Sequence, residues 1–133
     1  SDRVADPEDG LTQVTVVDDQ LGRLTFTRDM AEAIFHVLGT HAPYGTYNCT
    51  GSGAVKSWAD IASRVFELCN GNADAVKPVS TVEYCEGSKG LISPRPAHST
   101  LDLSKITAVG FLPRDWEECL VSAVQSLINN ASV

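Results

Sequence analysis

The segments that could form β-strands are few and short, and this limits the possible fold more than any other feature. Alternating β-branched residues predict a strand over 11–17, and brief extended segments are predicted over 45–50, 75–80 and 98–102. Longer helical patterns separate them, and this alternation favours an α/β fold. We expect a sheet this small to be completed by residues outside the 133 of this chain.

About four helices are predicted from apolar residues spaced three and four positions apart. In the second of them Ile61, Val65 and Cys69 share the apolar face, and the spacing of Ser57 and Asp60 matches a capping box. A single helical turn is also predicted over 81–84. The helices and their expected caps are 27–38 with Thr27, 58–71 with Ser57, 103–110 with Asp102 and 116–128 with Asp115.

The charge and the cysteines exclude several classes of function. A formal net charge of -7 argues against binding nucleic acid or an anionic membrane surface. The four cysteines form no C-x-x-C pair and have no histidine at ligand spacing, so no metal site is predicted. Free thiols, with no signal peptide and no membrane-length apolar run, indicate a cytoplasmic protein. Residues 1–10 are polar, and we interpret them as a solvated lead-in or an artificial boundary before a portion spanning 11–133.

No catalytic or cofactor group is convincing within the chain. A dinucleotide site needs a glycine-rich turn, and the best candidate, "GSGAVK" at 51–56, is better interpreted as a plain strand-to-helix turn. His36 and His41 have no catalytic partner nearby, so we interpret them as structural or solvated.

The first candidate binding loop is "DQLGRLT", where Gln20, Arg23 and Thr25 form a polar cluster between a strand and a helix. Gly22 would let the backbone turn sharply there. Ligands of α/β folds collect at strand ends, which makes this loop a site candidate. An ordinary polar connection explains the same residues equally well.

The second candidate loop holds Arg95 between Pro94 and Pro96. Each proline fixes its own φ and restricts the residue before it, so Arg95 is held extended. A guanidinium ordered in this way can bind a phosphate through two parallel hydrogen bonds. An exposed arginine in a proline-rich turn is the slightly simpler interpretation from these residues alone. His98, in the same loop, is a candidate ligand-facing side chain.

Three blocks of sequence, in this order and at these separations, resemble one known family. They are "VVDDQLGRLTFTRDMAEAI", "GTYNCTGSGAVKSWADIASRVFE" and "PRPAHSTLDLSKITAVGFLPRDWEECL". Together they resemble the C-terminal part of dTDP-4-dehydrorhamnose reductases, members of the extended short-chain dehydrogenase/reductase superfamily. The resemblance covers roughly Val14 to Val124.

The resemblance implies that this chain is the substrate-binding portion of a longer enzyme. In that family an N-terminal Rossmann domain carries the glycine-rich turn and a catalytic Tyr-x-x-x-Lys, and no tyrosine here makes that motif. The family transfers hydride from NADPH, or sometimes NADH, to the C4 ketone of dTDP-4-dehydro-L-rhamnose. The chain alone is therefore expected to bind the nucleotide-sugar at most, to bind no cofactor and to be inactive. A homodimer stays open for the full-length protein.

Site residues are carried over by position. Gln20, Gly22 and Thr25 match the family's Asp-Gln-x-Gly-x-Pro-Thr segment near the substrate. Arg95 matches the arginine of Arg-Pro-x-x-Ser-x-Leu-Asp, and in related enzymes an arginine near this point contacts the diphosphate. His98 stands where the family more often has Asn or Asp.

Three further matched residues, Asp29, Ser99 and Asp102, are interpreted as structural. Three other functions stay open at this point. One is a different nucleotide-sugar reductase or epimerase of the superfamily. The others are a non-catalytic, reductase-like regulatory subunit and a self-contained α/β interaction module.

Overall fold

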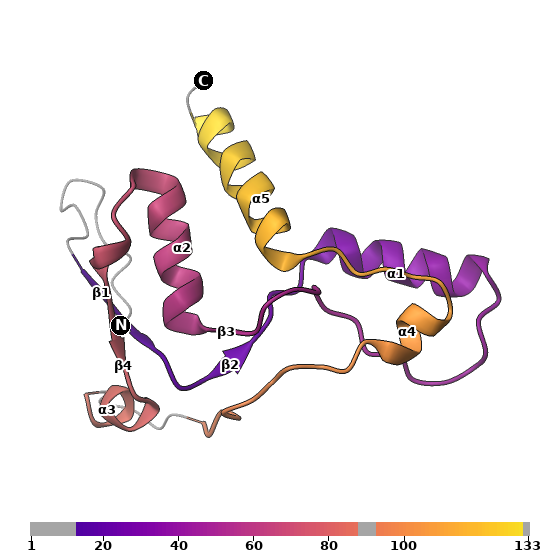
Figure 1. The fold of residues 1–133 in the computed structure, drawn as a ribbon, viewed down its shortest axis with the longest axis horizontal. Coiled ribbons are helices and arrows are strands. Elements are labelled where there is room, and N and C mark those ends of the chain that lie inside the picture. The colour runs from indigo at the N-terminus through magenta and orange to yellow at the C-terminus, as the bar shows by residue number, and fades with distance from the viewer. Residues whose placement is uncertain (1–12, 88–92, 132–133) are drawn as a thin grey trace.

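The structure is a computed structural model that describes residues 13–87 and 93–131. Within them it is a mixed α/β fold with very short strands, as the sequence predicts. The elements are β1 (Val14–Val17), β2 (Leu21–Gly22), α1 (Thr27–Gly39), β3 (Lys56–Ser57), α2 (Trp58–Asn70), the 3-10 turn η1 (Ala73–Ala75), β4 (Val76–Val79), α3 (Thr81–Glu86), α4 (Ser104–Ala108) and α5 (Trp116–Ala131). Figure 1 shows β1, β4, α2 and α3 at one end, α1 and α4 at the other, and α5 between them.

The described strands form two separate pairs. β1 and β4 are parallel, with Val14 opposite Val76 and Val17 opposite Val79, and α2 packs against both strands. Pro78 has no N–H to donate, so a strand containing it fits best at the edge of a sheet. β2 and β3 form a short antiparallel pair that brings the "DQLGRLT" loop to the start of α2.

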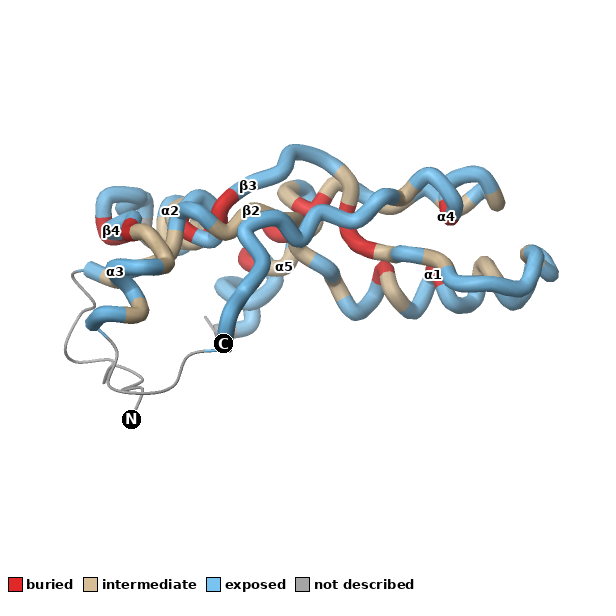
Figure 2. Tube along the Cα trace, turned by 90° about the horizontal axis from the view of Figure 1, so that it is seen from below, coloured by how far each residue is buried: buried red, intermediate tan, exposed pale blue. Residues whose placement is uncertain are grey.

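The main core lies between α2 and α5. Ile61 of α2 packs with Trp116, Leu120 and Val124 of α5, all buried. Trp116 is only 2% exposed, and its indole N–H donates to the Ala54 carbonyl at 2.7 Å. Buried segments gather where α2, α5 and β2 meet, whereas most of α1 is exposed (Figure 2).

The ends of α2 agree with the sequence prediction. Ser57 Oγ accepts the Asp60 N–H at 3.1 Å, and Asp60 Oδ2 accepts the Ser57 N–H at 3.1 Å, which completes the capping box. Gly71 ends the helix with a φ of 73°, a conformation that glycine adopts without strain. At α5 the cap is one-sided: Asp115 Oδ1 accepts the N–H groups of Glu117 and Glu118.

Two residues predicted as N-caps do not occupy the N-cap position, because their helices begin at other residues than expected. Thr27 is the first residue of α1 rather than its cap, and Phe26 precedes it with no side-chain cap. Asp102 lies two residues before α4, although its Oδ1 still accepts the Ser104 N–H at 2.8 Å.

Two other expectations were wrong. Residues 45–50 form no strand, because no described strand lies beside them to accept their backbone hydrogen bonds. That segment is held by other contacts, including Asn48 Nδ2 to the Asp102 carbonyl at 3.3 Å. Cys69 is exposed rather than buried, because its neighbour Leu68 is the residue of this turn that packs against the core.

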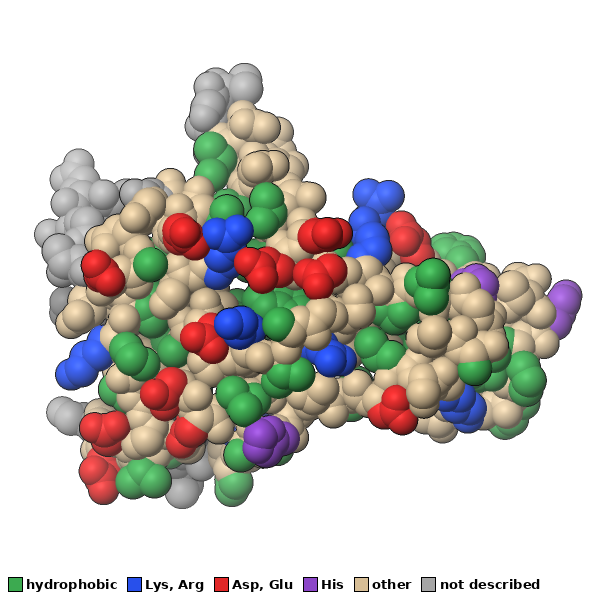
Figure 3. Space-filling view, viewed as in Figure 1, with side chains coloured by type: hydrophobic (Ala, Val, Ile, Leu, Met, Phe, Trp, Pro, Cys, Tyr) green, Lys and Arg blue, Asp and Glu red, His purple; other side chains and the backbone are tan. Residues whose placement is uncertain are grey.

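The arm formed by α1 and α4 leaves apolar side chains exposed. Ile106 of α4 and Ala33 of α1 are buried and line one apolar groove of about 250 Å³ with Met30 and Val37. Beside it, Phe35 and Leu38 are 77% and 68% exposed. Hydrophobic side chains are visible at the surface of this end (Figure 3). No helix in the described part of the chain is long and apolar enough to cross a membrane.

Candidate functional site

The two candidate loops lie side by side. Leu21 N–H donates to the Ala97 carbonyl at 2.7 Å, and Ser99 N–H donates to the Leu21 carbonyl at 2.9 Å. Because Gly22 also pairs with Lys56, β2 lies between the second loop and the segment before α2. Residues 78 positions apart in sequence therefore form one surface.

Gly22 is needed for a close approach rather than for a sharp turn. Its φ is not positive, unlike those of Gly53 and Gly71. A Cβ at Gly22 would lie 2.6 Å from Ser99 Oγ, which itself donates to the Leu21 carbonyl at 3.1 Å. A larger residue would force the Ser99 hydroxyl out of this position and break its hydrogen bond to Leu21. The contact also gives Ser99 the structural role expected of it.

The side chains of Gln20 and Thr25 are engaged within the protein. Gln20 Nε2 donates to Thr81 Oγ1 at 3.0 Å, at the start of α3. Thr25 Oγ1 lies 2.8 Å from Thr50 Oγ1. These contacts fix the two ends of the first loop, and a direct role for either side chain in binding a ligand stays a prediction.

Asp19 also holds the start of α3. Its carboxylate accepts both the hydroxyl and the backbone N–H of Thr81, the latter at 2.9 Å. These hydrogen bonds, the hydroxyl bond first, lower the pKa of Asp19 below its ordinary value. These bonds therefore favour the ionised form of Asp19.

Arg95 and His98 are both exposed, and neither side chain forms a hydrogen bond or ion pair with another described residue. The backbone beside them is fixed, because His98 forms a bridge with Leu21. Their side chains are thus available to contact a ligand, while the bridge to Leu21 holds the backbone of this segment in place.

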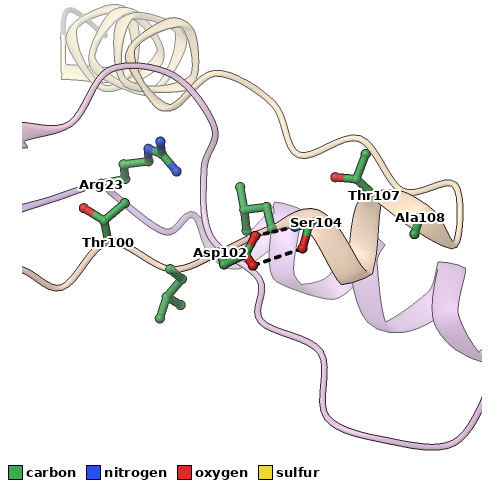
Figure 4. A pocket seen from close by; sticks show the side chains of 8 residues that line it. Arg23, Thr100, Asp102, Ser104, Thr107 and Ala108 are labelled. Carbon is green, nitrogen blue, oxygen red and sulfur yellow. Dashed lines mark hydrogen bonds between the residues drawn. The ribbon is translucent and has the colours of Figure 1, made fainter.

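Arg23 lines the candidate site, although matching by position did not include it. It is half-buried, its Nε donates to the Gly53 carbonyl at 2.9 Å, and it lines an open hollow of about 800 Å³. Figure 4 shows Arg23 and Thr100 at one end of this hollow and Thr107 with Ala108 at the other, with Asp102 and Ser104 between them. The signal in the sequence was a basic residue within the polar cluster of the first loop.

The "GSGAVK" segment is a structural turn. The Gly51 N–H donates to the Leu24 carbonyl at 3.1 Å, and the Ser52 N–H donates to the Arg114 carbonyl at 2.8 Å. A Cβ on Gly51 would lie 2.7 Å from Trp116 Cβ, so this glycine makes room for the core tryptophan. A phosphate-binding loop needs free N–H groups, and those of Gly51 and Ser52 are already bonded.

Asp29 joins the arm to the rest of the molecule. Its side chain is buried at the start of α1 and accepts hydrogen bonds from Arg114 Nε, at 2.7 Å, and Nη2. Cys119 Sγ lies 3.6 Å from the other carboxylate oxygen. Burial, with the charge of Asp29, raises the pKa of the Cys119 thiol. These contacts agree with the structural role predicted for Asp29.

Residues 4–129 match the model of one protein family, the RmlD substrate binding domain. The chain belongs to this family. Its relatives include the spore coat polysaccharide biosynthesis protein SpsK of Bacillus subtilis, which is 38% identical over 113 residues. That match covers 85% of this chain and 37% of SpsK.

Solved structures of relatives share the fold of this RmlD substrate-binding domain. A dTDP-4-dehydrorhamnose reductase from Clostridium acetobutylicum superposes with a TM-score of 0.74 at 31% identity, over 87% of this chain and 39% of that one. The enzyme of the same name from Bacillus anthracis, in complex with NADP, gives a TM-score of 0.67 at 32% identity, over 82% and 36%. The chain thus spans little more than a third of the length of these relatives.

Proposed function

We propose that this chain binds and orients the nucleotide-sugar in a longer, NADPH-dependent dTDP-4-dehydrorhamnose reductase. The observation that carries the proposal is the backbone contact between the two matched loops, through Leu21 with Ala97 and Ser99, beside an open hollow. The names of the similar reductases from Clostridium and Bacillus supply the reaction and the cofactor.

In this proposal Arg95 binds the diphosphate of the substrate. Its side chain is exposed and unpaired among the described residues, and its backbone is restricted by two prolines. Gln20, Gly22 and Thr25 fix the loop that faces it, and His98 lies on the same bridged segment. Holding the sugar in one orientation accelerates a reaction by proximity, without a catalytic group in this chain.

The hydride chemistry is assigned to another portion of the longer protein. NADPH would supply the hydride, but the described residues do not form a dinucleotide site, because the N–H groups of Gly51 and Ser52 are bonded to carbonyls. Each of the three tyrosines is followed four positions later by a residue other than lysine, so no Tyr-x-x-x-Lys motif is present. We therefore expect the tyrosine and the lysine in the cofactor portion.

The exposed apolar face of α1 is the expected contact with that cofactor portion. Ile34, Phe35 and Leu38 are more than half exposed, and Tyr44 in the following loop is fully exposed. Such a continuous apolar face usually marks an interaction surface. A sheet in the cofactor portion could also pair with residues 45–50, whose sequence is strand-like. A cytoplasmic location, favoured by the four unpaired cysteines, and a homodimer remain predictions.

The test is NADPH oxidation with dTDP-4-dehydro-L-rhamnose as the substrate, followed at 340 nm. The longer protein should turn over, whereas the 133-residue chain alone should not. Turnover by the chain alone, or no reduction of any dTDP-keto-sugar by the longer protein, would contradict the proposal. Reduction of a different dTDP-keto-sugar would keep the site and change its substrate.

A further inference from the structure

We propose that Arg23 is a second anion-binding residue of this site and contacts a phosphate group of the nucleotide-sugar from within the hollow. The inference rests on the proposed function, because it assigns a residue to the same ligand. Arg23 lies outside the residues carried over from the resemblance, and its role comes from its contacts.

The first support is the lack of a carboxylate partner. Arg28 pairs with Glu32, Arg64 with Glu67 and Glu117, and Arg114 with Asp29. Within residues 13–87 and 93–131, Arg23 and Arg95 form no ion pair. In a chain with a net charge of -7, an arginine without an acidic partner in an open hollow is suited to an external anion.

The second support is the fixed orientation of the guanidinium. Nε donates to the Gly53 carbonyl at 2.9 Å, which leaves both terminal nitrogens as donors. Gly53 has a φ of 99°, and the Asp115 carboxylate occupies the space where its Cβ would lie. The hydrogen bond to the Gly53 carbonyl holds the guanidinium in one orientation, and a pre-ordered guanidinium loses less entropy when it binds.

Arg23 and Arg95 lie on either side of the contact between the two loops. Leu21 N–H donates to the Ala97 carbonyl at 2.7 Å, and the bridge between Leu21 and His98 is parallel. Arg23, after Leu21, and Arg95, before Ala97, therefore lie toward opposite ends of the paired segment. Arg23 lines the hollow beside Thr100, and Arg95 approaches the ligand from the other end of the contact.

The rest of the hollow suits the part of a ligand that carries hydroxyl groups. Thr100, Ser104 and Thr107 line it together with Asp102. Both carboxylate oxygens of Asp102 accept hydrogen bonds from Ser104, at 2.8 and 3.0 Å, and these bonds lower the pKa of Asp102. An ionised Asp102 would repel a phosphate and accept hydrogen bonds from sugar hydroxyls, which places the phosphate at the Arg23 end.

The experiment compares Arg23→Gln, Arg23→Lys and the control Arg28→Gln in the longer protein. The control removes an exposed arginine that pairs with Glu32 on α1. The dissociation constant for thymidine diphosphate is measured by calorimetry, and KM and kcat are measured with the dTDP-keto-sugar. Arg23→Gln should raise the dissociation constant and KM by about 10- to 100-fold, because a charge-assisted hydrogen bond is lost. It should leave kcat within about 3-fold, since uniform binding is lost.

Arg23→Lys should recover part of the affinity, because it keeps the charge but not the planar pair of donors. An unchanged affinity for thymidine diphosphate in Arg23→Gln would overturn the inference, and so would a fall in kcat alone, which indicates a structural role. If the unmodified protein binds thymidine diphosphate but reduces no keto-sugar, the reductase proposal fails, while the Arg23 comparison still decides the inference. If it binds no thymidine diphosphate, both fail.

Discussion

The half built on α2 and α5 differs from the arm built on α1 and α4 in how completely it buries its own apolar residues. Trp116 and Leu120 are 2% and 7% exposed in the first half, whereas Phe35 and Leu38 are 77% and 68% exposed in the arm. The helices differ in the same sense, since α2 has a complete capping box and α1 has no side-chain cap. The first half has a buried core of its own, although Leu127 near the end of α5 is also 69% exposed. We propose that a further portion of the longer protein covers the apolar face of the arm.

Polar contacts between Asp29 and Arg114 nevertheless fix the orientation of the arm relative to the first half. The buried carboxylate of Asp29 accepts hydrogen bonds from Arg114, just before α5. Within the arm itself, His36 Nε2 of α1 lies 2.8 Å from the Val109 carbonyl that follows α4, and the imidazole ring packs at a tilt against Phe111. The arm is therefore oriented by polar contacts, while its apolar surface stays available for docking.

The largest effect is expected from a matched pair of leucine truncations. Leu120→Ala should destabilise the chain by about 2–5 kcal/mol, because it leaves a cavity in the core. Leu38→Ala should change the free energy of unfolding by less than about 0.5 kcal/mol, because this side chain is mostly exposed. Urea denaturation of the chain measures both values.

Making Leu120→Ala and Leu38→Ala in the longer protein tests whether the α1 face is buried there. There Leu38→Ala should also become costly, at about 2 kcal/mol or more, because the α1 face would be buried. A Leu38→Ala variant as well tolerated in the longer protein as in this chain would show that the cofactor portion does not cover α1.

A smaller loss of stability is expected when the residues at the N-termini of α2 and α1 are changed to alanine. Ser57→Ala should cost about 1 kcal/mol, because Ser57 Oγ accepts the Asp60 N–H at the start of α2. Thr27→Ala should cost less than about 0.5 kcal/mol, because the hydroxyl of Thr27 caps nothing in α1. Thermal unfolding of the two variants, followed by circular dichroism, makes the comparison, and equal losses would contradict it.

The smallest effect is a difference in alkylation rate between two cysteines, Cys119 beside Asp29 and the exposed Cys69. Only the thiolate reacts with iodoacetamide, and burial beside Asp29 raises the pKa of Cys119, so its thiolate is scarce at pH 8. Exposed Cys69 should therefore be modified first, and the rate at Cys119 should rise as the pH increases toward its raised pKa. Peptide mass spectrometry reads both sites, with the urea-unfolded chain as control. Equal rates in the folded chain at pH 8 would be the contrary result.

The sequence by itself determined the local structure well where one short segment contains all the interacting groups. The capping box of Ser57 with Asp60 and the left-handed Gly71 were predictable, because a cap joins groups only a few residues apart. The strand at β4 and the α/β class followed from side-chain patterns in the same way. The quoted blocks also led to the family that the chain belongs to.

What the sequence could not determine depended on partners far away in the chain. The strand expected over 45–50 did not form, because a strand requires a neighbour and none is present among the described residues. Gly22 was attributed to a sharp turn, but its φ is not positive, and it is instead the place where Ser99, 77 residues later in the numbering, comes close to the backbone. The sequence named Arg23 only as one of three polar residues of the first loop, and its hydrogen bond to the Gly53 carbonyl and its place in the hollow distinguished it from the other two. Sequence patterns predict contacts between residues within one or two turns of each other. Which backbone groups and charges from distant parts of the chain lie beside a side chain is decided only by the tertiary structure.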